Sequence, residues 1–291
     1  MGASKSKQLK YSVLMSVYKK EKPEYLLKSV KSMLSQTLVP DEILILKDGP
    51  LTSELNDVLK HFKSLNQSVV KIISFKKNRG LGPVLADGVI LARNNLIARM
   101  DSDDIADPTR CEKQINYFIN NPSYDIIGSN VTEFKNSIEK IVSSRIMPQN
   151  QDDILAYSRK RNPFAHPSVM FKKDTAISAG NYRDYKLCED YDLWVRMIKN
   201  GSRCYNIQEN LVSMRLDNNF YARRGGFTYV RRIVIFKKEL LDSGYCSFRD
   251  FLISTTSTVL VGMLPNILRS KLYYHLLRTQ KPTAEKDRSK L

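Results

Sequence analysis

Cysteine and histidine are scarce in this chain, which holds four cysteines and three histidines among 291 residues. Cys111, Cys188, Cys204 and Cys246 are scattered, with no C-x-x-C pair and no histidine clustered near them. Disulfide frameworks and zinc modules show regular cysteine spacings that are missing here. We therefore expect free, reduced thiols in a cytosolic protein.

The chain also has no long apolar run. Residues 1–10 are polar and basic without an apolar core, so no signal peptide is expected. The spacing of Gly2 and Ser6 fits an N-myristoylation signal, although so short a pattern often arises by chance. The apolar stretch Phe251–Leu264 is shorter than the roughly 20 residues that span a bilayer, and it ends before Pro265. A membrane-spanning helix is therefore not expected.

Acidic residues are few, because 30 Asp and Glu stand against 47 Lys and Arg, a formal net charge of +17. This excess would suit nucleic acid, an anionic membrane, or an anionic small molecule such as a nucleotide diphosphate. Charge alone does not choose among the three. The hydrophobic content of 42% is ordinary for a globular protein, so disorder is not the default.

Apolar runs and helical patterns alternate through the first hundred residues. We expect strands over 12–17, 42–46, 69–74 and 96–100, and helices over 23–36, 53–64 and 81–94. Further along we expect a helix over 108–121, strands near 124–132 and 168–171, and a helix over 190–199. This alternation predicts an α/β fold with a parallel sheet and helices on both faces.

Polar residues follow all four of these first strands. They are Tyr18, Asp48, Asn78–Arg79 and Asp101–Asp104. Ligands of parallel sheets bind beyond the carboxyl ends of the strands. The sequence therefore predicts a ligand site at this edge of the sheet.

The strongest candidate at that edge is the acidic triplet Asp101–Asp103. Two carboxylates in an i, i+2 arrangement on a loop after a strand can face one Mn²⁺ or Mg²⁺ ion, while substrate phosphates supply further ligands. Such an ion would stabilise the charge that develops on a departing diphosphate. Asp104 could act by hydrogen bonding instead. The alternative is an Asp-rich turn or a helix cap.

Three other positions are candidates with structural alternatives. Asp48 could accept a hydrogen bond from a uracil ring, or it could cap its own turn. Asn78 and Arg79 precede a predicted helix N-terminus, which is a suitable place for phosphate. His166, between Ala165 and Pro167, could face a diphosphate or an acceptor, or it could be structural.

Three acids, Glu189, Asp190 and Asp192, surround the predicted start of a helix. A carboxylate there is stabilised in its ionised form and can accept a proton. Acids are also ordinary residues for a helix start. Neighbouring positions on a helix face different directions, so only one of the three is expected to face a substrate.

Taken together, six segments resemble the bacterial family 2 glycosyltransferases of the GT-A fold. The segments are Ser16–Tyr18, Lys47–Pro50, Asn78–Gly80, Ala98–Asp104, His166–Ser168 and Glu189–Trp194. The likeness covers about residues 11–215 in the right order. It is greatest to the branch that builds capsule, exopolysaccharide or O-antigen repeat units on a lipid diphosphate.

The resemblance implies a Rossmann-like GT-A domain and an inverting transfer of a hexose or N-acetylhexosamine. The donor would be a UDP-sugar and the acceptor a saccharide linked to lipid diphosphate, with Mn²⁺ or Mg²⁺ on Asp101 and Asp103. The resemblance assigns Asp190 as the general base, with Asp192 and Glu189 in reserve. Contacts to the nucleotide sugar would come from Ser16, Tyr18, Asp48, Asn78, Arg79, Asp101 and Ser102. The chain departs from the usual pattern at Lys47 and Pro50, where Asp and Ser are common.

The expected domain organisation has three parts. Residues 1–10 form a flexible N-terminus, and residues 11–220 a GT-A domain with a nucleotide-sugar half (11–105) and an acceptor half (106–220). Residues 221–291 form a basic, amphipathic helical region, in which 267–278 mixes apolar and basic side chains. We expect this region to attach the protein to the inner face of the cell membrane. The alternative is that it packs on the protein's own core.

Three rival functions differ in what they require. A nucleotidyltransferase would carry a glycine-rich basic loop after the first strand, where this chain has Ser16–Lys20 and no glycine. A nucleic-acid-binding protein would explain the charge, but no recognisable module is visible. A non-catalytic assembly scaffold would not need acids at all the expected positions.

Overall fold

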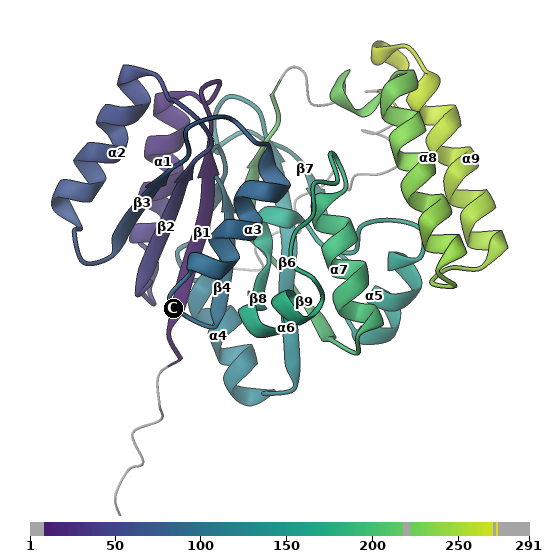
Figure 1. The fold of residues 1–291 in the computed structure, drawn as a ribbon, viewed down its shortest axis with the longest axis horizontal. Helices are drawn as coiled ribbons and strands as arrows, with labels where there is room; N and C mark the ends of the chain where they lie inside the picture. The colour runs from purple at the N-terminus through teal and green to yellow at the C-terminus, as the bar shows by residue number, and fades with distance from the viewer. Residues whose placement is uncertain (1–8, 218–221, 270–271, 273–291) are drawn as a thin grey trace, which may run out of the picture.

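The computed structural model describes residues 9–217, 222–269 and 272. A nine-stranded sheet runs through the molecule in the order β3-β2-β1-β4-β8-β6-β9-β5, with β7 paired to β6 (Figure 1). The strands are β1 (Tyr11–Val17), β2 (Glu42–Lys47), β3 (Val70–Ser74), β4 (Leu96–Asp101), β5 (Ile105–Ala106), β6 (Tyr124–Phe134), β7 (Ile141–Arg145), β8 (Met170–Lys172) and β9 (Arg203–Arg215). The helices are α1 (Pro23–Leu34), α2 (Ser53–Leu65), α3 (Leu81–Leu91), α4 (Arg110–Asn120), α5 (Gln151–Ser158), α6 (Lys173–Ser178), α7 (Glu189–Lys199), α8 (Phe227–Asp242) and α9 (Phe248–Met263).

The first four strands are parallel, as the sequence predicts, and their carboxyl ends are aligned. Ser16 of β1 lies in register with Leu46 of β2 and with Asp101 of β4. Because all four strands run the same way, the residues that follow them emerge at one edge of the sheet. The predicted ligand edge is therefore present. β6 and β9 are parallel to each other, while β8 runs antiparallel to both β4 and β6.

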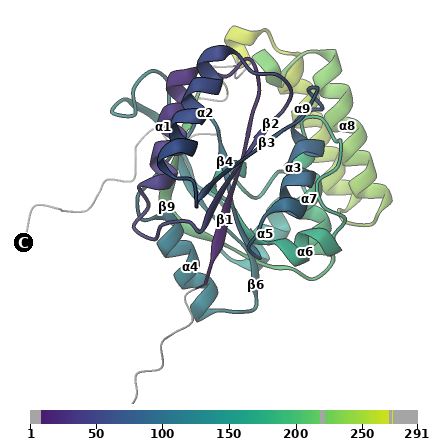
Figure 2. The same ribbon diagram turned by 60° about the vertical axis from the view of Figure 1, so that its left-hand side comes forward.

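Helices cover both faces of the sheet, which confirms the predicted layers. One apolar core joins the sheet to α1, α2 and α4, and a second joins it to α3, α6 and α7. Figure 2 shows these two groups of helices on opposite sides of the strands. The strands are apolar on both faces because both faces are buried. α3 ends earlier than the predicted 81–94 helix, because the backbone N–H groups of Arg93 and Asn94 bond to Glu42 and Ser12.

The second half contains elements that the sequence pattern does not predict. β9 is the longest of the strands described, and it pairs with β6 and with the short β5 that directly follows the acidic triplet. Its pairing with β6 shifts register at several points. Such bulges interrupt the two-residue alternation by which strands are recognised. β9 matters for function because it braces the acidic triplet.

Two antiparallel helices, α8 and α9, form a C-terminal hairpin beside α7 and α5 (Figure 1). Phe236 and Leu240 of α8 pack with Tyr191 of α7, and the hydroxyl groups of Tyr245 and Ser158 lie 2.6 Å apart. One side of the hairpin therefore packs on the protein's own core. Of the helix predicted over 267–278, residues 270–271 and 273–278 lie outside the described part of the chain.

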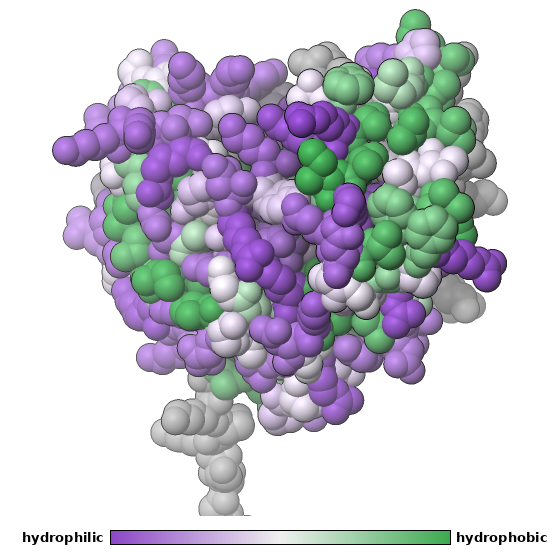
Figure 3. Space-filling view, turned by 45° about the vertical axis from the view of Figure 1, so that its right-hand side comes forward, coloured by the Kyte–Doolittle hydropathy of each residue, from purple (hydrophilic) through white to green (hydrophobic). Residues whose placement is uncertain are grey.

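The opposite side of the hairpin exposes apolar side chains. Leu252, Ile253, Leu260 and Met263 of α9 are each half or more exposed. Figure 3 shows apolar surface gathered over this region. Within the described residues, every helix is too short or too polar to cross a bilayer.

Candidate active site

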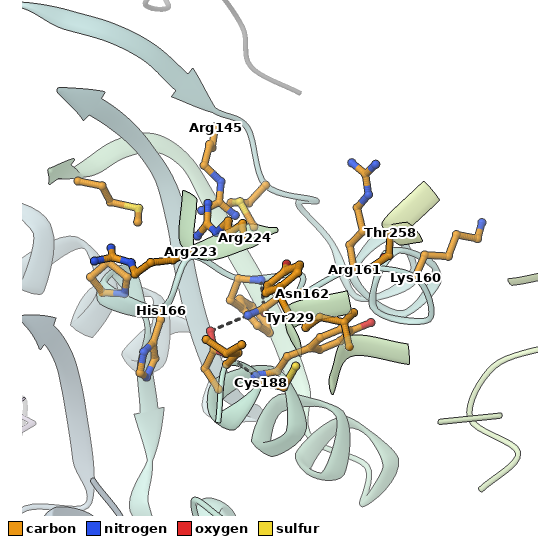
Figure 4. A pocket seen from close by; sticks show the side chains of 18 of the residues that line it. Arg145, Lys160, Arg161, Asn162, His166, Cys188, Arg223, Arg224, Tyr229 and Thr258 are labelled. Carbon is orange, nitrogen blue, oxygen red and sulfur yellow. Dashed lines mark hydrogen bonds between the residues drawn. The ribbon is translucent and has the colours of Figure 1, made fainter. Parts of the chain in front are cut away.

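A cavity of about 850 Å³ lies between the carboxyl edge of the sheet and the α8–α9 hairpin. Its wall includes predicted site residues from three separate segments: Asp101 and Asp103 after β4, His166 before β8, and Asp190 at the start of α7. Figure 4 shows His166 at one side of this cavity and Lys160, Arg161 and Thr258 at the other. The fold thus brings the metal candidates and the base candidate to one space.

The acidic triplet is held in place through its backbone and its neighbours. Asp101 forms an ion pair with Arg99, whose side chain is buried, and the Asp101 carbonyl accepts a hydrogen bond from Ser29 at 2.7 Å. Asp104 is buried, and its carboxylate accepts a hydrogen bond from the backbone N–H of Arg215 in β9 at 2.7 Å. Asp104 therefore positions the loop, which is the hydrogen-bonding role considered for it.

Asp103 faces the cavity between these two anchored aspartates. Burial, and then the negative charges of Asp101 and Glu21, raise the pKa of its carboxyl to about 7. Glu21 is not predicted as a site residue, although it follows β1 at the same edge. Its carboxylate accepts a hydrogen bond from the Ser102 hydroxyl at 2.5 Å, so the Ser102 side chain points toward Glu21.

The triplet has the chemistry of a site for a hard divalent cation. Burial and the neighbouring negative charges both disfavour ionisation of Asp103, and a bound cation would offset them. In the part of the chain that the structure describes, no three His, Cys, Asp or Glu side chains are grouped as around a metal ion. Mg²⁺ is commonly bound by one or two carboxylates while phosphates and water complete its shell. Asp101 and Asp103 fit that kind of partial site.

Asp48 organises the loop that precedes α3. Its buried carboxylate accepts hydrogen bonds from the Asn78 amide (2.8 Å) and from the backbone N–H groups of Arg79 (2.7 Å) and Gly80 (3.1 Å). Gly80 has a φ of 90°, a conformation that glycine adopts without strain. Asp48 therefore caps the loop of residues 78–80, which lies 30 to 32 residues further along the chain, rather than its own turn. The uracil contact stays a prediction.

The expectation that Arg79 presents its charge to phosphate is not met in this structure. Its guanidinium forms an ion pair with Asp87 of α3 and lies over the Phe75 ring, 4.3 Å from the ring centre. Phosphate contact in this loop would therefore fall to backbone N–H groups. Ser16, next to the last residue of β1, is half-buried. Tyr18 is exposed, and the charges of Asp103 and Arg223 both act on its hydroxyl group.

The acids at the start of α7 face different ways. The Asp190 carboxylate lies in the cavity wall and accepts hydrogen bonds from the Asn162 amide (2.6 Å) and the Tyr191 backbone N–H (2.8 Å). Burial raises the pKa of Asp190, and these two hydrogen bonds lower it. Asn162 was not predicted as a site residue.

The two reserve acids have other surroundings. Asp192 is buried and paired with Arg196, at 3.0 Å from Nε and 2.7 Å from a terminal nitrogen. Because this pairing occupies its carboxylate and Asp192 is not part of the cavity wall, Asp192 is less well placed than Asp190 and stays the reserve base. Glu189 has one buried carboxylate oxygen without a hydrogen-bond partner in the structure, and burial raises its pKa to about 7.

His166 begins a short 3₁₀ turn and touches the cavity. Its Nε2 lies 3.0 Å from the Tyr182 hydroxyl, and its ring contacts Trp194 edge-on. Burial lowers the pKa of His166, as does the nearby positive charge of Arg99. The imidazole is therefore neutral near pH 7, and both the structural and the acceptor-side interpretations fit its position.

Two known proteins are similar to this chain over most of its length. The UDP-Gal:alpha-D-GlcNAc-diphosphoundecaprenol beta-1,3-galactosyltransferase of Escherichia coli is 36% identical over 271 residues, which cover 92% of this chain and 97% of that protein. The amylovoran biosynthesis glycosyltransferase AmsE of Erwinia amylovora is 35% identical, over 86% of this chain and 94% of its own.

Among solved structures, the mannosyltransferase PcManGT of Pyrobaculum calidifontis, in complex with GDP-Man and Mn²⁺, superposes with a TM-score of 0.60 at 12% identity. The alignment covers 93% of this chain and 82% of that one, which supports the GT-A fold. The sequence pattern of glycosyl transferase family 2 matches residues 12–231, most of the chain. This chain belongs to glycosyl transferase family 2.

Proposed function

We propose that this chain transfers a hexose or N-acetylhexosamine, with inversion, from a UDP-sugar to a saccharide on a lipid diphosphate. The observation that supports this most strongly is the single cavity that holds the acidic triplet and, on a different element, the hydrogen-bonded carboxylate of Asp190. The acidic triplet would bind the leaving group through a cation, and the Asp190 carboxylate would accept the proton of the incoming hydroxyl. Family membership sets aside a nucleotidyltransferase and a nucleic-acid-binding protein.

On the donor side, Asp101 and Asp103 would hold Mn²⁺ or Mg²⁺ against the diphosphate of the nucleotide sugar. The cation, when bound, stabilises the negative charge that develops on the departing UDP. Arg99 and Ser29 fix the position of Asp101, and Arg215 and Asp104 fix the end of the triplet. Backbone groups of the loop that Asp48 organises would contact the nucleotide.

On the acceptor side, Asp190 would take the proton of the attacking hydroxyl as the new glycosidic bond forms. Each carboxylate oxygen already accepts one hydrogen bond, and each has a second lone pair that can face the substrate. Asn162 would hold the carboxylate in one orientation. A neutral alcohol is a poor nucleophile, so a base at this position would accelerate the displacement by roughly 10²–10⁴-fold.

The acceptor class comes from the relatives. The Escherichia coli relative is named for transfer from UDP-Gal to GlcNAc-diphosphoundecaprenol, and its match extends over nearly the whole of both chains. The test of the proposed function is UDP release from a panel of nucleotide sugars with a lipid-diphosphate-linked GlcNAc analogue. One sugar should give acceptor-dependent release. No release above hydrolysis with every donor would contradict the proposal.

The pH profile of the reaction should depend on Asn162. Its amide stabilises the ionised form of Asp190, so Asn162→Ala lets burial raise the pKa of Asp190 further. A base works only when deprotonated, so activity is lost as pH falls through this pKa. We expect the acid limb of kcat/KM to move to higher pH in Asn162→Ala and to stay in place in Asn120→Ala, an exposed control at the end of α4. An unchanged acid limb would argue against Asp190 as the base.

We also propose that the protein lies on the inner face of the cell membrane through the α8–α9 hairpin. Leu252, Leu260 and Met263 form an exposed apolar surface on α9, and Arg231 and Arg232 of α8 are exposed cations on the same hairpin. Apolar side chains beside cations suit the surface of an anionic bilayer.

Leu260→Asp should therefore weaken binding to anionic liposomes by about tenfold or more, because it replaces an inserted apolar group with a charge that the membrane repels. Leu260 is 66% exposed, so the substitution does not disturb the core. Leu65→Asp is the matched control, since Leu65 is 67% exposed at the end of α2. Flotation with vesicles of phosphatidylglycerol measures both. Equal flotation of the two variants would place the attachment elsewhere.

A further inference from the structure

The cavity continues past Asp190, away from the acidic triplet, into a compartment formed by the end of α5 and by the α8–α9 hairpin. Its wall there includes Lys160, Arg161, Lys237 and Thr258. Figure 4 shows Arg161, Lys160 and Thr258 together on the side of the cavity opposite His166. The mechanism above assigns no task to these cations.

Lys237 is the most informative of them because it is buried. Its ammonium donates hydrogen bonds to the Ser254 carbonyl and, at 2.6 Å, to the Thr258 hydroxyl, which leaves one of its three donors. Burial, and then the positive charge of Arg161, lower the pKa of Lys237 to about 8. A buried cation is costly unless an anion accompanies it.

In the described ranges of the chain, no anionic side chain accompanies the Lys237 ammonium. Lys160 is paired with Asp250 at 3.2 Å, but neither Lys237 nor Arg161 forms an ion pair with a described carboxylate. Arg161 is exposed, lies three residues after the end of α5, and is close enough to Lys237 for their charges to interact. Two neighbouring cations without an acid between them form a site for an anion that comes with a ligand.

The position of this compartment identifies which anion it would take. The donor diphosphate belongs at Asp101 and Asp103, at the other end of the cavity, and Asp190 lies in the wall between. In an inverting displacement the acceptor approaches from the side opposite the leaving group. A second anion beyond Asp190 therefore belongs to the acceptor.

We propose that Arg161 and Lys237 bind the diphosphate of the lipid-linked acceptor, an inference that rests on the proposed function. The Thr258 hydroxyl lies beside them, and Val261 and Gly262 of α9 continue the same wall. Past these residues α9 exposes Leu260 and Met263, so a hydrocarbon chain leaving the diphosphate would meet the apolar surface. Sugar, diphosphate and lipid would then lie in order along one path.

Arg161→Ala tests the site without risk to the fold, because Arg161 is exposed and lies in the loop after α5. The acceptors are GlcNAc joined to an alkyl chain through a diphosphate, and the same GlcNAc joined directly as a neutral glycoside. We expect a roughly 10–100-fold higher KM for the diphosphate acceptor, from loss of charge-assisted hydrogen bonds. The neutral glycoside, the KM for the donor and slow UDP-sugar hydrolysis should not change.

Arg159→Ala is the matched control, since Arg159 is exposed two residues away and lies outside the cavity wall. Lys237→Met removes the buried charge and keeps much of the side-chain volume. It should raise the same KM, with Lys238→Ala, on the solvent side of α8, as its control. If Lys237→Met does not fold, the Arg161 variant decides alone. An unchanged KM in Arg161→Ala, or equal wild-type KM for both acceptors, would overturn the inference.

A binding measurement separates this inference from the proposed function. Calorimetry of the full chain with dodecyl diphosphate needs no turnover. EDTA in the buffer removes divalent metal, so that the diphosphate does not bind at the donor-side carboxylates. Wild type should bind dodecyl diphosphate tighter than dodecyl phosphate and much tighter than dodecanol, and Arg161→Ala should lose about tenfold or more. Equal binding by wild type and Arg161→Ala refutes the diphosphate site. Absence of transfer with this binding intact would refute the proposed function instead.

Discussion

Asp190→Asn is expected to lower turnover by at least ~10²-fold while the KM for the UDP-sugar stays close to that of wild type. Asparagine keeps the shape of the side chain, and its carbonyl oxygen can still accept one of the two hydrogen bonds, but it cannot act as a base. The change therefore removes the chemistry with little change in geometry. Single-turnover kinetics with saturating donor, acceptor and Mn²⁺ measures the effect.

Asp192→Asn provides the contrast on the same helix. The Asp192 carboxylate pairs with Arg196, whose guanidinium also donates to the carbonyl groups of Ala179 and Asn181. Breaking this network should lower the melting temperature, and the folded fraction should retain turnover. If Asp190→Asn stays active while Asp192→Asn is inactive though folded, the base is at position 192. If Glu189→Gln alone is inactive, the base is Glu189.

The sequence predicts β1 to β4 well because each is a short, mostly apolar run bounded by a turn, and β1, β2 and β4 are buried on both faces. The polar residues after those strands are predictable for the same reason, since parallel strands bring their ends together. Glu21 lies at the same edge and could have been found by that rule. Its side chain reaches Ser102 across the sheet edge, a contact that depends on tertiary structure.

Other features of the site follow from contacts that sequence spacing describes poorly. The pairing of Asp192 could have been predicted from the sequence, since Asp192 and Arg196 are four residues apart on a helix. The role of Asn162 could not, because a loop brings its amide to Asp190 from 28 residues away. Likewise β9 is interrupted by bulges, so its bracing of Asp104 through Arg215 emerges only in three dimensions.

Removal of divalent metal is expected to reduce transfer by roughly 10³-fold or more, because such a cation supplies several kcal/mol of charge stabilisation. EDTA should abolish activity, and Mn²⁺ or Mg²⁺ should restore it. Asp103→Asn should be inactive with metal present, since Asp101 is already engaged by Arg99 and cannot complete the site alone. Initial rates of UDP release over a titration of Mn²⁺ measure both effects.

Asp103 rather than Asp104 is the informative position, because the two adjacent carboxylates do different work. Asp104 is tied to the Arg215 backbone, so its replacement would loosen β9 and confuse stability with metal binding. The Asp103 side chain has no such task, and the loss of a carboxylate whose pKa is raised by burial and by like charges should leave the fold as stable as before or more so. In wild type, Mn²⁺ with UDP should therefore raise the melting temperature, because the ligand binds only the folded chain. The same addition should leave the melting temperature of Asp103→Asn unchanged.

Full activity of folded Asp103→Asn in EDTA would show that protein cations, rather than a metal ion, stabilise the leaving diphosphate. Arg223, whose charge acts on Tyr18, would then be the first residue to test.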